Sequence, residues 1–383
     1  MATGKKEHFM KLRYGIIGTG MIAEHQAKAL GDVENAEVTA VLSRSSRRAQ
    51  EFAEKFDCRA CTETKEFLSE VDAVSICTPA GLHLDSALPV LEAGKHLMVE
   101  KPLEINLKRG MQIVEAAEKK GLKLGGIFQS RFYESSRVIK TALEDGRFGR
   151  LVMGDAYVKW FRSQEYYDRT DWKGSFEYDG GGALMNQAIH AVDLLQWFMG
   201  QVQSVQARCS ILGHSGIEVE DTAAAVLEFD SGALGVIEGS TAVYPGFLKR
   251  IEISGTHGTA VLEEEELKTW SFESEIPEDM EIRRRCGVKS GSGGGSFGSG
   301  GHQYPGAPAS VRGLYQSSSG KRDPLCRRNR VPEIGGNNRS NLRKRKARQN
   351  GSGGAPVVSR GFNQLFQPCG AQGVRDCFSG GSA

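Results

Sequence analysis

The feature that most constrains this chain is a glycine turn near its N-terminus. A short apolar run, Ile16-Ile17, leads into Gly18-Thr19-Gly20, and a helical pattern follows from Met21 to Leu30. Glycine at both positions lets a strand turn sharply into a helix and lets a pyrophosphate approach the backbone N–H groups at the helix start. Ala23 completes a G-x-G-x-x-A pattern, in which a small side chain lets the helix sit against the strand. The turn predicts a dinucleotide site formed by Gly18, Gly20, Met21 and Ile22.

Length and composition set broad limits on the fold. A chain of 383 residues has room for two domains, and its 39% hydrophobic and 25% charged residues are ordinary for a globular protein. No apolar run approaches the roughly 18 residues that a membrane span needs. The polar first nine residues lack the apolar core of a signal peptide, so we expect a cytoplasmic protein without a membrane partner.

The eight cysteines lack the spacing of a disulfide framework, which suits a reducing compartment. Cys58-x-x-Cys61 can be a metal-binding or redox pair, or simply two buried thiols. No second pair and no nearby histidine completes a zinc set, and the segment is typical of a short strand. We therefore favour buried thiols and expect no metal site.

Strand and helix signals alternate through the first part of the chain. This alternation predicts an α/β Rossmann domain, a doubly wound parallel sheet, over residues 11–148, after an N-terminal extension of residues 1–10. Further strands are expected at 37–42, 58–61, 71–77, 96–99 and 122–128. Ligands of such sheets bind beyond the carboxyl ends of the strands. At these ends lie five residues that we assign to the cofactor: Thr78, Pro79, Glu100, Lys101 and Gln129.

The end of the second strand bears on the type of cofactor. An NAD site usually places Asp or Glu here for the ribose hydroxyls, but this chain has Ser43-Arg44-Ser45-Ser46-Arg47-Arg48. Without a carboxylate, and with guanidinium groups that can bind a 2′-phosphate, Ser43 and Arg44 favour NADP over NAD. The alternative is a solvated first turn of the next helix, so either cofactor remains open.

Lys101 is a candidate catalytic residue. It follows a strand and precedes Pro102, so its ammonium can face a substrate oxygen and polarise it. The alternative is an ordinary exposed lysine. Position alone does not decide between the two.

From residue 149 the pattern changes to longer alternating strands. Candidates lie at 151–158, 202–212, 222–229, 234–240, 249–254 and 259–262. They predict an α+β domain over residues 149–285, with a mostly antiparallel sheet of about six strands. We expect this domain to bind substrate and to join copies of the chain into a homo-oligomer through its sheet.

One helix, expected over 183–195, interrupts that sheet and carries dense polar chemistry. Asn186, His190 and Asp193 are spaced i, i+4, i+7, so they share one helix face. Because histidine titrates near neutral pH, His190 is a plausible proton acceptor. A structural histidine is the alternative. Just upstream, Trp172 can stack on a sugar or belong to the core.

The combination of these motifs resembles the glucose-fructose oxidoreductase/inositol dehydrogenase (Gfo/Idh/MocA) family. The matching features, in order, are Gly18-x-Gly20-x-x-Ala23, Glu100-Lys101-Pro102, and Gly180-Gly181-Gly182 leading to His190-x-x-Asp193. They extend over residues 11 to 275. Together they are far more specific than any one of them.

The resemblance implies an NAD(P)-dependent oxidoreductase that oxidises a sugar or cyclitol hydroxyl or reduces the ketone. It implies that Lys101 and His190 handle the proton. Many members have Asp four residues before the histidine, where this chain has Asn186, an amide that orients a hydroxyl but cannot act as a base. Candidate substrate contacts are Asn186, Asp193, Trp172 and Arg131. A non-catalytic, cofactor-binding regulatory or sugar-sensing protein of the same fold is the alternative.

The last part of the chain is a different kind of sequence. Residues 286–383 carry a net charge of +12, whereas residues 1–285 carry −10. A glycine- and serine-rich stretch and the basic run Arg343-Lys344-Arg345-Lys346 are typical of a disordered arm that can contact nucleic acid. A one-base frameshift between about Arg285 and Val311 explains this tail better, because the alternative frame permits amphipathic helices like those that end the family's proteins. We therefore expect no nucleic-acid partner.

Overall fold

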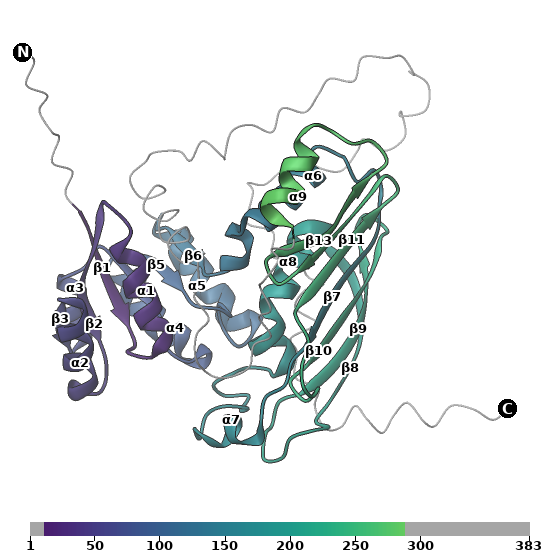
Figure 1. Cartoon of the computed structure of the whole chain (residues 1–383). Coiled ribbons are helices and arrows are strands. Elements are labelled where there is room, and N and C mark those ends of the chain that lie inside the picture. Colours follow the sequence, from purple (N-terminus) through teal and green to yellow (C-terminus); the bar gives the residue numbers. More distant parts are fainter. Residues whose placement is uncertain (1–10, 288–383) are drawn as a thin grey trace, which may run out of the picture.

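The computed structural model describes residues 11–287, and these form two sheets that lie side by side (Figure 1). The first sheet is parallel with strand order β3-β2-β1-β4-β5-β6. Its order reverses between β1 and β4, which creates the crevice where such sheets bind ligands. The strands are β1 (Leu12–Ile17), β2 (Ala36–Leu42), β3 (Arg59–Cys61), β4 (Ala73–Ile76), β5 (His96–Val99) and β6 (Leu124–Gly126).

Helices pack on both faces of this parallel sheet. They are α1 (Met21–Gly31), α2 (Ser46–Phe56), α3 (Thr64–Ser69), α4 (His83–Glu92) and α5 (Leu107–Lys119). One core contains Tyr14 and Leu30, and the core on the opposite face contains Phe67 and Leu91, all fully buried. Because both faces of the sheet are covered, the sequences of its strands are short continuous apolar runs. The predicted Rossmann fold is confirmed.

The second sheet is mostly antiparallel and has the order β13-β12-β11-β7-β10-β9-β8. Only β7 and β10 pair in parallel. The predicted fold class is confirmed, but the expectation of about six strands was one short. The strands are β7 (Leu151–Lys159), β8 (Val202–Ser210), β9 (Thr222–Phe229), β10 (Leu234–Ser240), β11 (Arg250–Gly255), β12 (Gly258–Glu263) and β13 (Glu266–Phe272).

The strand that the sequence did not reveal is β13. Its register against β12 shifts between Val261 and Leu262, so its buried residues do not alternate evenly. The run of glutamates before Leu267 also resembles a solvated loop. Irregular pairing of this kind hides a strand from a search for period-two patterns.

Helices cover one face of the second sheet, the face toward the parallel sheet (Figure 1). They are α6 (Glu134–Glu144), α8 (Ile189–Met199) and α9 (Glu278–Cys286), with the short α7 (Gln164–Asp168) at one end. Helix α8 packs on β7 and β11 and lies between the two sheets. It therefore brings second-domain residues toward the ends of the parallel strands.

The helix expected over 183–195 is not regular. It begins with a π-helical turn, Ala183–Ala188, and continues as α8 to Met199. π-Helical turns are rare and often mark functional positions, because they change the direction of side chains and carbonyls. The assumption that Asn186, His190 and Asp193 follow one uniform helix was wrong, although all three lie on this one continuous segment.

Helix α9 was also missed by the sequence analysis. It is strongly charged, and the carboxylate of Asp279 ties it to the body by accepting from Arg147 and from Trp270 Nε1. Burial opposes the charge of Asp279, but these donors lower its pKa to about 2. Because α9 is highly charged and is held by one buried carboxylate, its sequence has no apolar stripe from which a helix could be predicted.

The predicted N-terminal extension and the basic tail fall outside residues 11–287, except for the first two residues of the tail, Cys286 and Gly287. Within the described part, no helix is both long and apolar enough to cross a membrane.

Candidate active site

The glycine turn has the geometry that a bound pyrophosphate requires. Gly18 has φ +111°, and a Cβ there would lie 2.8 Å from the carbonyl oxygen of Cys77. Gly20 caps the N-terminus of α1, and a Cβ on it would have no atom within 4 Å. Met21 is 64% exposed and Ile22 half-buried in the first turn. The helix start is therefore open for a phosphate.

Beyond β2 the structure places Ser43 and Arg44 beside this turn, since the N–H of Gly18 donates to the carbonyl of Leu42. Ser43 Oγ accepts from the N–H of Ser45. Arg44 is exposed and has no ion-pair partner within the described residues. Its guanidinium is available to an anionic group.

The ends of β4 and β5 are joined by a buried histidine. His83 Nε2 lies 2.9 Å from the carbonyl oxygen of Thr78, and its Nδ1 lies 3.0 Å from that of Pro102. The side-chain hydroxyl of Thr78 is buried without a partner in the described part of the chain. An unpartnered polar atom at the end of a strand that borders the crevice is consistent with a ligand that supplies the missing bond.

Lys101 reaches from β5 across to the second domain. Its Nζ donates to the backbone carbonyl of Asn186 at 2.9 Å, within the π-helical turn. Desolvation lowers the pKa of Lys101, opposed by the charges of Glu100 and Asp179. Desolvation raises the pKa of Glu100, which accepts a bond from Gln26 at 3.0 Å. Lys101 is therefore not an ordinary surface lysine.

His190 lies at the same junction. Its Nε2 is 3.4 Å from Nε2 of Gln129, while Nδ1 is buried without a partner among the described residues. Burial lowers the pKa of His190 well below 6.5, and the positive charges of Lys101 and Lys249 lower it further. The ring is thus neutral at neutral pH, which is the form that accepts a proton.

Asp179 is a site residue that the sequence analysis did not single out. One carboxylate oxygen accepts from Asn186 Nδ2 at 2.7 Å and the other from the N–H of Gly174 at 2.7 Å. Its charge also acts on Lys101. Asn186 is thereby held by its side chain and holds Lys101 by its carbonyl. The signal in the sequence was present, because Asp179 directly precedes Gly180-Gly181-Gly182.

Arg131 and Asp193 were both predicted to contact substrate, and the structure brings them together. Arg131 Nε and Nη2 donate to the two oxygens of Asp193, one of them at 2.8 Å. Both carboxylate oxygens are engaged, so Asp193 orients Arg131, and a direct contact of either with substrate stays a prediction. Trp172 is half-buried, with Lys173 Nζ 5.9 Å from its ring centre.

Of the Cys58-Cys61 pair, Cys61 is buried and Cys58 is half-buried. Both are free, and burial raises the pKa of Cys58 to about 11. Over residues 11–287, no three His, Cys, Asp or Glu side chains are grouped so that they could hold a metal ion.

Comparison with known proteins identifies the family. Residues 12–127 match the Gfo/Idh/MocA oxidoreductase family with an NAD-binding Rossmann fold, and residues 136–261 match its C-terminal domain. A myo-inositol 2-dehydrogenase of Thermotoga maritima is 31% identical over 254 residues, 64% of this chain and 74% of that protein. The chain belongs to the Gfo/Idh/MocA family. It is therefore an NAD-binding oxidoreductase, as predicted.

Two further similar proteins differ from the first in the cofactor or ligand that their names or titles give. A scyllo-inositol 2-dehydrogenase (NADP(+)) of Bacillus subtilis is 28% identical over 283 residues, 72% of this chain and 80% of that protein. Among solved structures, the WlbA dehydrogenase of Bordetella pertussis in complex with NADH and UDP-GlcNAcA has a TM-score of 0.73 and 32% identity. That match covers 82% of this chain and 89% of that one. The proteins similar to this chain thus include one named for NADP(+) and one solved in complex with NADH.

The described residues fit a nicotinamide dinucleotide. The open helix start at Gly20, the left-handed Gly18 and the unpartnered hydroxyl of Thr78 lie on one edge of the parallel sheet. Lys101 and His190 meet at the same edge from two different domains. Which of these residues touch cofactor or substrate stays a prediction.

Proposed function

We propose that this protein transfers hydride between a sugar or cyclitol hydroxyl, or its ketone, and a nicotinamide cofactor. Lys101 and His190 handle the proton. The observation that carries the proposal is their convergence, because Lys101 Nζ binds the carbonyl of Asn186, one helical turn before His190. A bound nicotinamide supplies the hydride acceptor or donor at its C4.

The proton chemistry follows from the environment of each side chain. During oxidation, neutral His190 accepts the substrate's hydroxyl proton at Nε2, where the amide of Gln129 lies at 3.4 Å and a hydroxyl can replace it. The ammonium of Lys101 stabilises the alkoxide that develops on the substrate oxygen. Asn186 fixes the position of Lys101, with Asp179 holding Asn186 in turn.

For the cofactor we favour NADP over NAD. The support is local, because no Asp or Glu follows β2 and Arg44 is exposed without an ion-pair partner in the described part. Arg47, in contrast, is bound by Glu51 and is less available. A 2′-phosphate can accept a charge-assisted hydrogen bond from Arg44, whereas the 2′-hydroxyl of NAD makes a weaker neutral one.

The second domain also has a surface suited to homo-oligomer formation. On the face of its sheet away from α8, three apolar side chains are 40–55% exposed: Met153, Val226 and Leu234. Met153 and Leu234 are direct neighbours across β7 and β10. We propose that a second copy of the chain covers this face, and that Val226→Lys shifts the oligomer toward monomer in light scattering, with cofactor binding unchanged.

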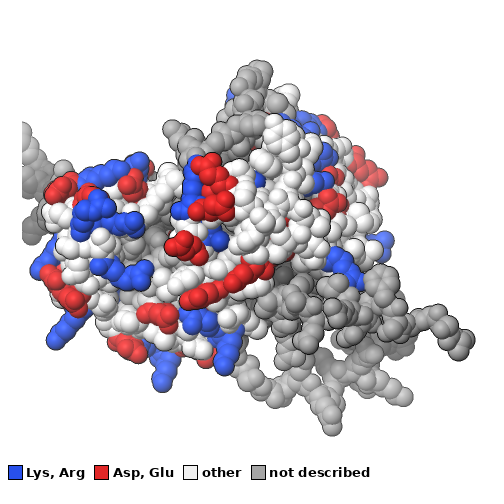
Figure 2. Space-filling view, turned by 90° about the horizontal axis from the view of Figure 1, so that it is seen from below, with Lys and Arg blue, Asp and Glu red and all other residues white. Residues whose placement is uncertain are grey.

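The face shown in Figure 2 gives no support to a nucleic-acid partner. Its lysine and arginine side chains are interspersed with aspartate and glutamate. Nucleic-acid sites typically gather positive charge on one face.

A substrate panel tests the proposed function. The full chain is incubated with NAD or NADP and with myo-inositol, free sugars or nucleotide sugars, and the absorbance of the reduced cofactor is followed. We expect turnover of at least one sugar or cyclitol, with NADP giving the higher kcat/KM. Bound cofactor without any turnover would instead indicate a regulatory or sugar-sensing protein of the same fold.

A further inference from the structure

Two cations lie over one aromatic ring, that of Tyr166. The guanidinium carbon of Arg162 lies 5.6 Å from the ring centre of Tyr166, and Lys173 Nζ lies 4.1 Å from the same centre. Both residues belong to the segment that joins β7 to the π-helical turn. Cations over one ring are held in place, since the ring face attracts positive charge.

Hydrogen bonds connect this pair of cations to Lys101. Arg162 Nη2 donates to Gln187 Oε1 at 3.0 Å. The amide of Gln187 donates to the hydroxyl of Tyr166 at 3.2 Å and to Asn186 Oδ1 at 2.9 Å. Because the carbonyl of Asn186 accepts from Lys101, the cations lie within a few side chains of the proposed hydride-transfer position.

Neither cation has a carboxylate within ion-pair distance in the described part of the chain. The charge of Asp179 acts on Lys173, but both carboxylate oxygens of Asp179 already accept hydrogen bonds, from Gly174 and Asn186. Burial lowers the pKa of Lys173, opposed by the charge of Asp179. Two partly buried like charges with no carboxylate in direct contact are unfavourable, and an anionic ligand reduces that cost.

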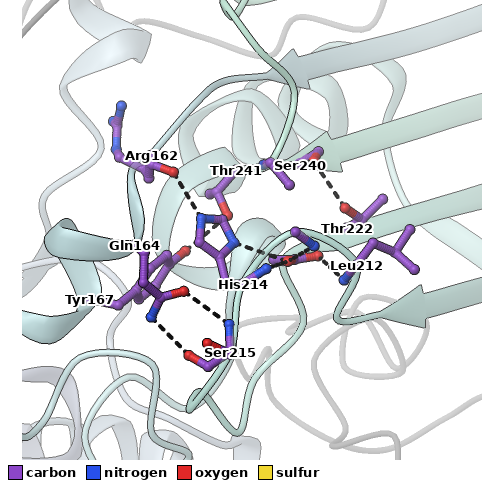
Figure 3. A network of polar contacts seen from close by, with 12 residues as sticks. Arg162, Gln164, Tyr167, Leu212, His214, Ser215, Thr222, Ser240 and Thr241 are labelled. Carbon is purple, nitrogen blue, oxygen red and sulfur yellow. Dashed lines mark hydrogen bonds and ion pairs between the residues drawn. The ribbon is translucent and has the colours of Figure 1, made fainter.

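Hydrogen bonds of its main chain also hold Arg162 in position (Figure 3). Its carbonyl faces His214 Nε2 at 2.8 Å, and its N–H donates to the carbonyl of Thr241 at 2.7 Å. His214 Nδ1 in turn lies 3.0 Å from a carboxylate oxygen of Asp221, which is fully buried. Figure 3 shows the guanidinium pointing away from this network. A pre-positioned charge loses little freedom when it binds.

We propose that Arg162 and Lys173 bind an anionic group of the substrate, so that the substrate is an acidic or phosphate-bearing sugar and not a neutral cyclitol. This inference rests on the proposed function. The recognised chemistry is a carboxylate or phosphate, for which a guanidinium and an ammonium are the natural partners. UDP-GlcNAcA, the ligand in the Bordetella pertussis structure, carries both groups.

Binding to the full chain saturated with NADPH or NADH tests the proposal. Titration calorimetry with UDP-GlcNAcA compares the wild type with Arg162→Gln and Lys173→Gln. We expect each variant to bind at least tenfold more weakly, with cofactor affinity unchanged. Arg169→Gln is the matched control, because this nearby arginine is paired with Glu165 and should bind like the wild type.

Two further probes separate the sources of negative charge. UDP-GlcNAc keeps the diphosphate without the sugar carboxylate, and glucuronate keeps a carboxylate without the diphosphate. The probe whose binding is weakened by the two substitutions identifies the group that Arg162 and Lys173 bind. A melting temperature within about 2 °C of the wild type shows that each variant is folded, and Arg162→Lys should restore part of the affinity.

Equal binding of UDP-GlcNAcA by the wild type and both variants would overturn the proposal, as would turnover of myo-inositol with the same KM in all three. In the second case the proposed oxidoreductase function would stand. Failure of every protein to bind NADPH or NADH would instead overturn the proposed function itself.

Discussion

The two sides of the proposed site are built in different ways. On the cofactor side, residues from separate strands reach one edge because the strands are parallel, so Gly18, Thr78 and Lys101 meet by topology alone. On the substrate side, positions depend on one irregular turn and on individual hydrogen bonds, such as that between Asp179 and Asn186. Topology can be predicted from a repeating pattern, whereas single contacts cannot.

Substitution of the proposed proton-handling residues should have the largest effect. Lys101→Met and His190→Gln each remove a group that acts in the transition state, so we expect kcat to fall about 10²- to 10⁴-fold. Because His190 is not among the residues assigned to the cofactor, cofactor affinity of His190→Gln should stay within about threefold, as measured by quenching of protein fluorescence. Wild-type rates in both variants would show that the substrate side does not supply the chemistry.

Cofactor binding can be weakened by a substitution that leaves the fold intact. A Cβ at Gly20 meets no atom within 4 Å, so Gly20→Ala should keep the wild-type melting temperature. It occupies the space of the pyrophosphate, and we expect the Kd for reduced cofactor to rise about tenfold or more. Gly18→Ala is the contrasting variant, because φ of +111° and the contact with the Cys77 carbonyl should cost about 1–3 kcal/mol of stability as well. Unchanged affinity in Gly20→Ala would place the dinucleotide elsewhere.

A smaller effect is expected at the end of β2. Arg44→Gln removes one exposed guanidinium, and we expect KM for NADP to rise about five- to tenfold, consistent with loss of one charge-assisted hydrogen bond in solvent. KM for NAD should hardly change, and Arg47→Gln serves as the control because Arg47 is paired with Glu51. Parallel changes for both cofactors would contradict the preference for NADP.

The smallest expected effect is the dependence of kcat/KM on pH. The proton acceptor must be neutral during oxidation, and burial lowers the pKa of His190 well below 6.5. The base form therefore already dominates at pH 6.5, and log kcat/KM for oxidation should be flat from about pH 6.5 to 8 and fall only at lower pH. An activity that rises steeply between pH 6.5 and 8 would assign the proton to another group.

The sequence was informative where patterns repeat. The alternation of strands and helices predicted the parallel sheet, and the strand ends placed Thr78, Glu100, Lys101 and Gln129 on one edge. The same approach missed β13, because a bulge breaks its alternation, and α9, because a buried carboxylate rather than an apolar stripe holds it.

The substrate side was predicted only in part. Spacing identified His190, but a uniform helix was assumed where a π-helical turn begins the segment. The pairing of Arg131 with Asp193 joins residues 62 positions apart in the chain, and no local pattern reports such a contact. Asp179 was passed over although it directly precedes Gly180-Gly181-Gly182, because its hydrogen bonds to Asn186 and Gly174 follow from no repeating pattern.

The tail hypothesis concerns residues beyond those described. It remains a prediction that a one-base frameshift between about Arg285 and Val311 produced the basic C-terminal sequence. Resequencing the DNA through this region decides it. An intact reading frame into Arg343-Lys344-Arg345-Lys346 would reject the frameshift.

The central claim is direct hydride transfer between a substrate carbinol carbon and the nicotinamide cofactor at the junction of Lys101 and His190. The most direct measurement is a single turnover of the full chain with NADP and a substrate from the panel that carries deuterium on its reacting carbon. The account predicts deuterium at C4 of the reduced nicotinamide, and a much slower appearance of that product in His190→Gln. Reduced cofactor without deuterium, or an equal rate in the variant, would contradict it.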